Sequence, residues 1–557
     1  TARPLPVADA LSHVIRAYHP TAKLPESLAE LRALYLSVLH DQRALLLMDN
    51  ARDETQVEPL IPPPNCLLLV TSRFHFTVPG LKVKNLDALR PADAVKLLLE
   101  IAPRIGDQAA EIARLCGNLP LGLRLAASVL ATRLNFKVAE YVRKLADASE
   151  RLKLIDASLS LSYELLREEL QTNWRALAVF PDSFDQRAAA AVWELDDAQT
   201  QERLAELLTF SLVEWNESTD QYRLHDLARV FADSRATESE RLTNQQRHAE
   251  HYLQVLLEAD QLYLKGGEAI NQGLALFDRE WSNALAGWNW AKRHADTIPR
   301  ALELCSEYPA WCTYIPDFRQ HPRERIAWRE VALSAARKLG NKDAQSWHLG
   351  NLGIAYWSLG EYQRAIEFHE QELAIEREIG NRNNEGKALN SLGNAYKDLG
   401  ETQRAIEFYE QSTAICHEIG DHRSEGAALL NQGSAYWDLG DYQRAIEFYE
   451  QSLAICREIG DRGGEGHALC GLGIAYFKLD ETSRAVEFYK QQLAITREIG
   501  DRRGEGIVLW NTALALDKLG ERAQAIVYAQ ASLVIYEQIE NPWVEDVRRQ
   551  LEIWRSE

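Results

Sequence analysis

The C-terminal part of this chain repeats itself every 40 residues. Glycines recur at that spacing at Gly353, Gly393, Gly433 and Gly473, and a tyrosine follows each of them three residues later. A fixed period of this length is typical of a solenoid, in which each unit buries its apolar face only against its neighbours. Stacked units leave a long groove, so we expect this part of the chain to recognise a partner rather than to catalyse a reaction.

Composition narrows the class of protein further. The chain has 557 residues and a net charge of −20, so we expect several domains and no DNA binding, because an acidic surface repels phosphates. Its seven cysteines lack the spacing of a disulfide framework or a zinc site. We find neither a signal peptide nor an apolar run that could span a bilayer, and therefore expect a cytoplasmic protein.

One 40-residue unit predicts two helices. Within residues 385–420, small and apolar side chains recur at helical spacing on both sides of Gly400, which breaks the helix. We expect the two helices to approach closely at the small Gly393. Tyr396 and Phe408 should fill the space beside that contact.

This unit resembles the tetratricopeptide repeat (TPR), and its long period resembles that of the Pins/LGN scaffold proteins. Residues 459–466 carry the turn signature of that class, IGDR followed by EG. The resemblance implies a solenoid that holds a protein or peptide on its concave surface. Members of the class grip extended peptides with an asparagine just after the small glycine, and here only Asn394 keeps that residue.

Three residues beyond the asparagine position, the repeats carry Trp357, Lys397, Trp437 and Phe477. TPR geometry implies that these side chains and Asn394 face the groove and form the partner-binding site. An aromatic-lined groove would suit an apolar or helical segment. The alternative interpretation is that the aromatic rings pack against adjacent helices.

Four short motifs follow one another in the N-terminal half. Two apolar runs, predicted to be strands buried on both faces of a parallel sheet, lead into Asp49 and Arg73. Further along, the segment CGNLPL contains Pro120, and the segment LHD contains His225. In this order they resemble the Walker B, sensor, GLPL and MHD motifs of the NB-ARC module of STAND-class signalling ATPases, some of which carry TPRs.

The resemblance implies a nucleotide site. Asp49 would hold Mg²⁺, Arg73 would reach a γ-phosphate, Pro120 would pack against adenine, and His225 would contact the β-phosphate of ADP. Asn50 stands where a carboxylate would activate water, so at most slow ATP hydrolysis is expected.

The resemblance also implies a mainly α fold with a partial α/β nucleotide-binding domain and a C-terminal α-solenoid. The predicted domains are a partial NB-ARC domain (1–82), a helical ARC1 domain (83–152), a winged-helix ARC2-like domain (153–238), a helical connector for which a degenerate TPR is one interpretation (239–342), a TPR solenoid (343–541) and a C-terminal helix or tail (542–557).

One family element is missing from the sequence. The phosphate-binding loop GxxxxGK[ST] does not occur, and the sole methionine is Met48. We expect a fragment, with the loop encoded upstream of Thr1; the alternative is a degenerate domain that binds no nucleotide. ADP or ATP with Mg²⁺ is therefore expected in the full-length protein, whereas this chain alone should bind neither tightly and should not be catalytic.

Two functions remain open at this point. The first is a signalling regulator in which ADP holds a closed form, a ligand on the TPR groove releases it, and ATP exchange favours a homo-oligomer. The second is a plain TPR scaffold for protein–protein interaction with an inert NB-ARC remnant.

Overall fold

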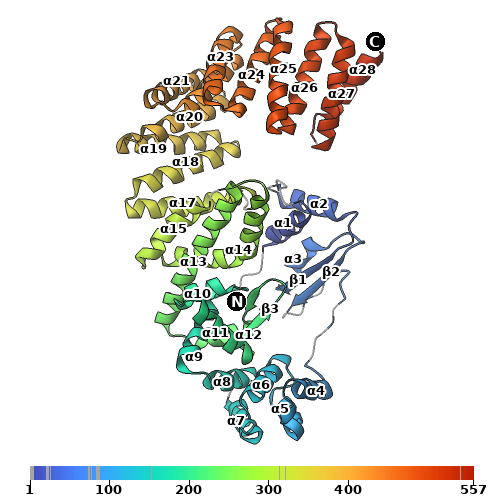
Figure 1. The fold of residues 1–557 in the computed structure, drawn as a ribbon, viewed down its shortest axis with the longest axis vertical. Coiled ribbons are helices and arrows are strands. Elements are labelled where there is room, and N and C mark those ends of the chain that lie inside the picture. Colours follow the sequence, from blue (N-terminus) through green and yellow to red (C-terminus); the bar gives the residue numbers. More distant parts are fainter. Residues whose placement is uncertain are drawn as a thin grey trace. The chain divides into compact units, whose positions relative to one another are not determined.

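The computed structural model describes residues 6–19, 24–25, 27–72, 76, 78–82, 84, 88–151, 154–312, 314–319, 322–539 and 541–556. The chain forms two compact units, Thr1–Ala335 and Ala336–Glu557. Both are mainly helical, and a small sheet lies near the N-terminus of the first (Figure 1). Among the described residues, no helix is long and apolar enough to cross a membrane.

The first unit begins with a small α/β layer. Its elements are α1 (Val7–Tyr18), α2 (Leu28–Leu39), β1 (Leu45–Ala51), α3 (Glu54–Val57), the 3₁₀ turn η1 (Glu58–Leu60) and β2 (Leu67–Ser72). The two strands are parallel, with Leu45 opposite Leu67. Helices α1 and α2 bury an apolar cluster that includes Leu11 and Tyr35, whose hydroxyl donates a hydrogen bond to the Leu60 carbonyl.

The prediction that both strands are buried on both faces is wrong for one face. Leu45 and Leu47 of β1 are 67% and 66% exposed, and Leu67 and Leu69 of β2 are 65% and 53% exposed. Alternation along each strand places these leucines on one side of the sheet, whereas the intervening residues face the helices. A parallel sheet is ordinarily covered on both faces, so this apolar surface lacks its cover within the described residues.

A helical layer follows the sheet. It contains α4 (Pro91–Ile101), η2 (Pro103–Gln108), α5 (Ala109–Leu115), α6 (Pro120–Thr132), α7 (Val138–Arg151) and α8 (Leu154–Glu164). The predicted break near residues 117–120 is confirmed. Gly117 and Asn118 take positive φ angles of 63° and 54° there, which ends α5 and allows Pro120 to begin α6.

Short helices and a β-hairpin come next. The elements are α9 (Glu168–Ala176), η3 (Leu177–Val179), α10 (Gln186–Trp193), α11 (Asp197–Thr209), β3 (Glu214–Asn216), β4 (Gln221–Arg223) and α12 (Asp226–Arg235). The strands pair antiparallel, as the sequence predicts, with Trp215 opposite Tyr222. Trp174 is fully buried beneath the hairpin, where its indole N–H donates to the Leu212 carbonyl at 3.1 Å.

Five helices complete the first unit and lead into the second. They are α13 (Glu238–Leu264), α14 (Glu268–His294), α15 (Pro299–Trp311), α16 (Ile315–Arg319) and α17 (Pro322–Leu339). The division at Ala335 therefore falls within α17. The predicted domain limits, including the start of the solenoid at residue 343, remain predictions.

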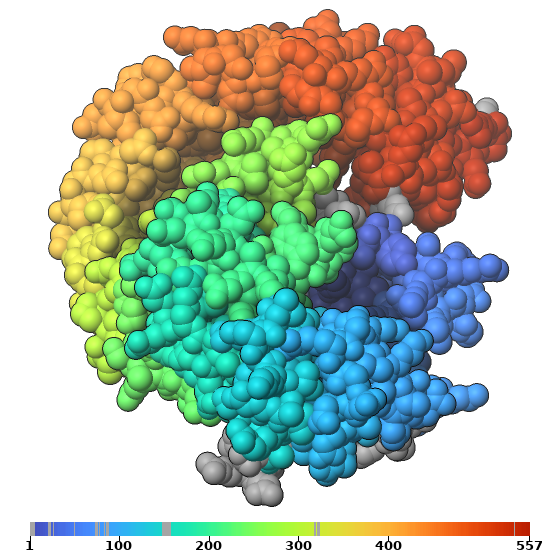
Figure 2. Space-filling model, turned by 60° about the horizontal axis from the view of Figure 1, so that its bottom comes forward, coloured from blue at the N-terminus to red at the C-terminus, as the bar shows by residue number. Residues whose placement is uncertain are grey.

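The second unit consists of stacked helix pairs. First helices are α18 (Lys342–Ser358), α20 (Arg382–Asp398), α22 (His422–Asp438), α24 (Arg462–Lys478) and α26 (Arg502–Lys518). Second helices are α19 (Tyr362–Ile379), α21 (Thr402–Ile419), α23 (Tyr442–Ile459), α25 (Thr482–Ile499) and α27 (Arg522–Gln538), and α28 (Val544–Ser556) follows them. The predicted solenoid is confirmed, and it forms a continuous curved band, coloured yellow to red in Figure 2.

The pair of α20 and α21 shows how the period builds this packing. The rings of Tyr396 and Phe408 stack at 5.2 Å, and equivalent stacks recur in the neighbouring pairs. Gly393 lies directly against the ring of Tyr409, so its missing side chain is what allows the two helices to approach. First helices also contact one another along the array, which places them on its inner side.

Replacing Gly393 with alanine should lower the free energy of unfolding of the array by about 1–3 kcal/mol, because the added Cβ would overlap the Tyr409 ring. Urea denaturation followed by circular dichroism measures the change. The matched control is Gly463→Ala in α24, where the nearest atom to the added Cβ is Asp461 Oδ1 at 3.5 Å. That variant should be stabilised by about 0.5–1 kcal/mol, and equal effects of the two substitutions would contradict the packing argument.

Candidate functional site

The first candidate site is the end of β1. Asp49 is exposed there, and its Oδ1 accepts a hydrogen bond from the Thr71 hydroxyl of β2. The two parallel strands therefore bring a carboxylate and a hydroxyl together, and these are oxygen donors of the kind that Mg²⁺ prefers. Arg73 and the Asn50 side chain lie outside the described residues, so their predicted roles stay predictions.

Pro120 and His225 lie near an ion pair that joins α6 to the β-hairpin. Pro120 is the exposed first residue of α6, and one turn later Arg124 lies 3.3 Å from Glu214 of β3. His225 follows β4 and caps α12, because its Nδ1 accepts a hydrogen bond from the Leu227 amide at 3.2 Å. The sequence analysis missed Arg124 and Glu214, since neither belongs to a recognisable motif.

The environment of His225 favours its neutral form. Burial lowers the pKa of this imidazole, and the nearby Arg223 and Arg124 lower it further, while Glu214 and Asp226 oppose them. A neutral Nδ1 that accepts from a backbone amide agrees with that direction. Among the described residues, no hydrogen bond or ion pair joins Asp49 to Pro120 or His225.

The residues present fit only part of a nucleotide site. Asp49 and Thr71 could hold a magnesium ion, and an ion pair joins the helix of Pro120 to β3, the partner of the strand that precedes His225. The sequence contains no GxxxxGK[ST] motif, the loop whose backbone cradle holds the phosphates in such sites.

The second candidate site is the inner side of the array. Trp357 is 40% exposed, and its indole N–H donates to Asp398 of the next first helix at 2.8 Å. Asn394 accepts a hydrogen bond from the Tyr409 hydroxyl at 2.8 Å, and Lys397 donates to the Ser434 hydroxyl at 3.4 Å. These three predicted groove residues therefore lie on neighbouring first helices.

Trp437 and Phe477 are less open. Both are half-buried; Trp437 packs near Tyr442, and the Lys518 ammonium lies 4.7 Å from the centre of the Phe477 ring. Trp357 is thus the most exposed ring of this row, whereas Trp437 and Phe477 pack partly against neighbouring side chains. The assignment of these residues to a partner-binding groove stays a prediction.

Two further residues extend the exposed apolar surface of α18. Trp347 is 48% exposed and Ile354 is 53% exposed. Ile354 and Trp357 follow Trp347 by seven and ten residues on the same helix, which places the three side chains on one face. The sequence analysis missed Trp347 because the equivalent positions of the other repeats hold unrelated residues, such as Lys387 and Ala427.

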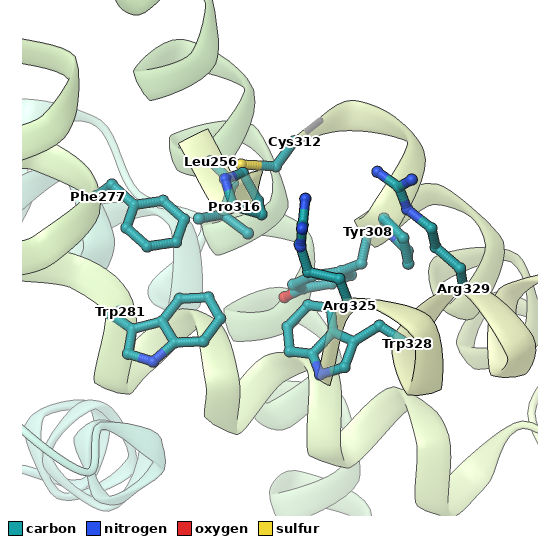
Figure 3. Close-up of a pocket in the computed structure, with 10 residues that line it drawn as sticks. Leu256, Phe277, Trp281, Tyr308, Cys312, Pro316, Arg325, Trp328 and Arg329 are labelled. Carbon is teal, nitrogen blue, oxygen red and sulfur yellow. The ribbon is translucent and has the colours of Figure 1, made fainter. Parts of the chain in front are cut away.

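A narrow pocket in the first unit is better explained as packing than as a binding site. Trp328 stacks on Trp281 at 5.6 Å and on Trp288 at 4.3 Å, and Arg325 lies beside these rings (Figure 3). The space between the side chains holds no more than about one water molecule. We infer that this aromatic cluster fixes α14 against α17.

Comparison with known proteins decides the nature of the array. The family model described as tetratricopeptide repeat matches three overlapping segments, 344–418, 384–458 and 424–498. Residues 344–498 are tetratricopeptide repeats. The resemblance to the tetratricopeptide repeat is confirmed for this part of the chain.

The chain is also similar in part to bacterial regulators. The regulatory protein AfsR of Streptomyces coelicolor is 36% identical over 257 residues, which cover 43% of this chain and 26% of AfsR. AfsR of Streptomyces griseus is 36% identical over 233 residues, covering 39% of this chain and 24% of that protein. The chain thus spans about a quarter of the length of these curated relatives.

Among solved structures, a signal transduction ATPase with numerous domains (STAND) and a TPR sensor from Pyrococcus horikoshii resembles 97% of this chain and 80% of its own chain. The identity is 16% and the TM-score is 0.48. BtubC from P. vanneervenii resembles 39% of this chain at 18% identity, with a TM-score of 0.37 and 92% of its own chain covered.

Proposed function

We propose that this chain is part of a regulatory protein in which the TPR array binds a protein or peptide and the first unit belongs to an ADP/ATP-dependent switch. The exposed apolar face of α18 carries the first half of the proposal. A partner that covered this face would bury the exposed side chains of Trp347, Ile354 and Trp357, and their burial would favour binding.

The switch half rests on the first unit. Asp49 and Thr71 place two oxygen donors at the end of a parallel sheet, and the Arg124–Glu214 pair joins the helix of Pro120 to the hairpin that leads to His225. The similarity to AfsR, a regulatory protein, supports a regulatory role. A nucleotide-dependent homo-oligomer belongs to the same proposal.

The uncovered leucines of β1 and β2 support a further part of the proposal. Additional secondary structure that covers this face would complete the sheet, and we place the phosphate-binding loop in that additional segment. This chain by itself should then bind nucleotide weakly or not at all.

The test compares this chain with a protein extended upstream by the genomic sequence. We expect ADP to co-purify with the extended protein, as measured by chromatography of the heat-released nucleotide, and isothermal titration calorimetry to detect no tight ADP binding to this chain. Asp49→Ala in the extended protein should weaken retention, whereas the matched control Asp41→Ala, in the turn before β1, should not. An extended protein that retains no ADP would favour a TPR scaffold with an inert remnant.

A further inference from the structure

The last helix pair of the array differs from the others on one face of its second helix. This face consists of six rows of residues 40 apart, which begin at residues 363, 367, 370, 371, 374 and 378. In α19, α21, α23 and α25 each face carries three charged side chains and no apolar residue larger than alanine. In α27 the six positions hold Ala523, Val527, Gln530, Ala531, Val534 and Gln538, and we call this surface the end face. It has lost all three charges and gained two valines.

The structure leaves the end face open to solvent. Val527 is 62% exposed and Val534 is 52% exposed, and within the end face only Ala531 is half-buried. Helix α28 contacts α27 but leaves both valines exposed. Exposed apolar side chains at positions where four equivalent helices keep charges indicate a surface that another molecule covers.

The charge of the end face argues for what covers it. An uncharged surface offers no carboxylate to a basic segment and no cation to an acidic one. A second copy of this chain carries the same net charge of −20, so two copies approach most easily where both surfaces lack charge. A symmetric contact also places the same patch of both copies together, so the glutamates that the other repeats carry would face like charges. These glutamates are the residues that α27 lacks.

The order of side chains on the end face is self-complementary. In an antiparallel pair of α27 helices, residues equally far from the two-fold axis on opposite sides face each other. The midpoint between Ala523 and Val534 coincides, to within one residue, with the midpoint between Val527 and Ala531. A two-fold axis at this point places each valine opposite an alanine of the other copy. The larger side chain then fills the space beside the smaller one, as close packing of two helices requires.

We propose that the end face joins two copies of this chain, with their α27 helices packed antiparallel about a two-fold axis. Helix α27 has 17 residues and is therefore about 25 Å long, so the contact is small. We expect weak association, with a dissociation constant of about 0.1 mM. This contact goes beyond the proposed function, because it requires neither a nucleotide nor a peptide bound to the array.

Sedimentation equilibrium of the full chain, between about 10 µM and 0.5 mM, tests the contact. The mean mass should rise from that of a monomer towards that of a dimer, and added salt should strengthen association by screening the repulsion between the copies. Val527→Glu restores the residue of the other four repeats at an exposed position, so α27 should stay folded. It should weaken association at least about tenfold. The matched control Gln451→Glu adds the same charge at an exposed position of α23 and should change the dissociation constant less than about twofold.

The possible results separate the dimer from the switch. A chain that stays monomeric up to about 0.5 mM would overturn the proposed dimer and assign the end face to a different protein. Association that Val527→Glu and Gln451→Glu weaken equally, or that neither weakens, would overturn its placement on α27. Val527→Glu should leave ADP retention by the extended protein unchanged, so a failure of the dimer and a failure of the proposed switch are distinguishable.

Discussion

Replacement of Trp174 by alanine should lower the free energy of unfolding of the first unit by about 3–5 kcal/mol. The side chain is fully buried, and its ring lies 5.8 Å from Tyr163 and 6.1 Å from Phe231. Truncation would leave a cavity between α9 and α12 and would also remove the donor to the Leu212 carbonyl. Trp174 thus joins the short helices to the start of the hairpin.

Two further variants divide this effect into its parts. Trp174→Phe keeps most of the buried volume but loses the hydrogen bond, so we expect a smaller loss, near 1–3 kcal/mol. Trp215→Ala is the control, because this tryptophan is 41% exposed on the hairpin and should contribute much less. Urea denaturation of the full chain measures all three, and a Trp174→Ala protein as stable as Trp215→Ala would disprove the assignment.

Acidification should destabilise the first unit through His248. This residue is 2% exposed between Phe180 and Tyr252, and burial, assisted by His251, lowers its pKa to about 3. An imidazole in the unfolded chain titrates near pH 6.5. Below that pH the unfolded chain binds a proton that the folded protein excludes, so stability falls as the pH drops from about 6.5 towards 3.

The size of this effect follows from the separation of the two pKa values. At pH 5 the loss attributable to His248 should be about 2 kcal/mol. His248→Phe removes the titrating group, so the variant should gain about that amount relative to the wild type between pH 7 and pH 5. Burial also lowers the pKa of His251. Because this residue is present in both proteins, its contribution to the pH dependence of stability cancels in the difference. Parallel pH profiles for the two proteins would contradict the prediction.

Much of the array could be predicted from its period. Gly393 and Tyr396 recur every 40 residues, and a recurring small residue beside a recurring ring indicates the same helix contact in each unit. What the period could not provide is the partner of that glycine. The ring that covers Gly393 belongs to Tyr409, because the direction of side chains along α21 places that residue, rather than its neighbour, over the glycine.

The candidate sites were less predictable. Asp49 was found because it ends an apolar run, but its contact with Thr71 depends on which strands pair and in what register. Arg124 and Glu214 are 90 residues apart and carry no local signal, so only the packed structure shows that they meet. Trp347 and Ile354 were overlooked because exposure is a property of the assembled surface.

The sequence by itself determined that the 40-residue repeats stack as a solenoid, because each repeat finds its burial partner at a fixed distance along the chain. It could not determine which face of β1 and β2 stays uncovered, or that His248 is excluded from water. Those outcomes depend on contacts between segments with no fixed spacing, and only the tertiary structure decides which side chains such contacts remove from solvent.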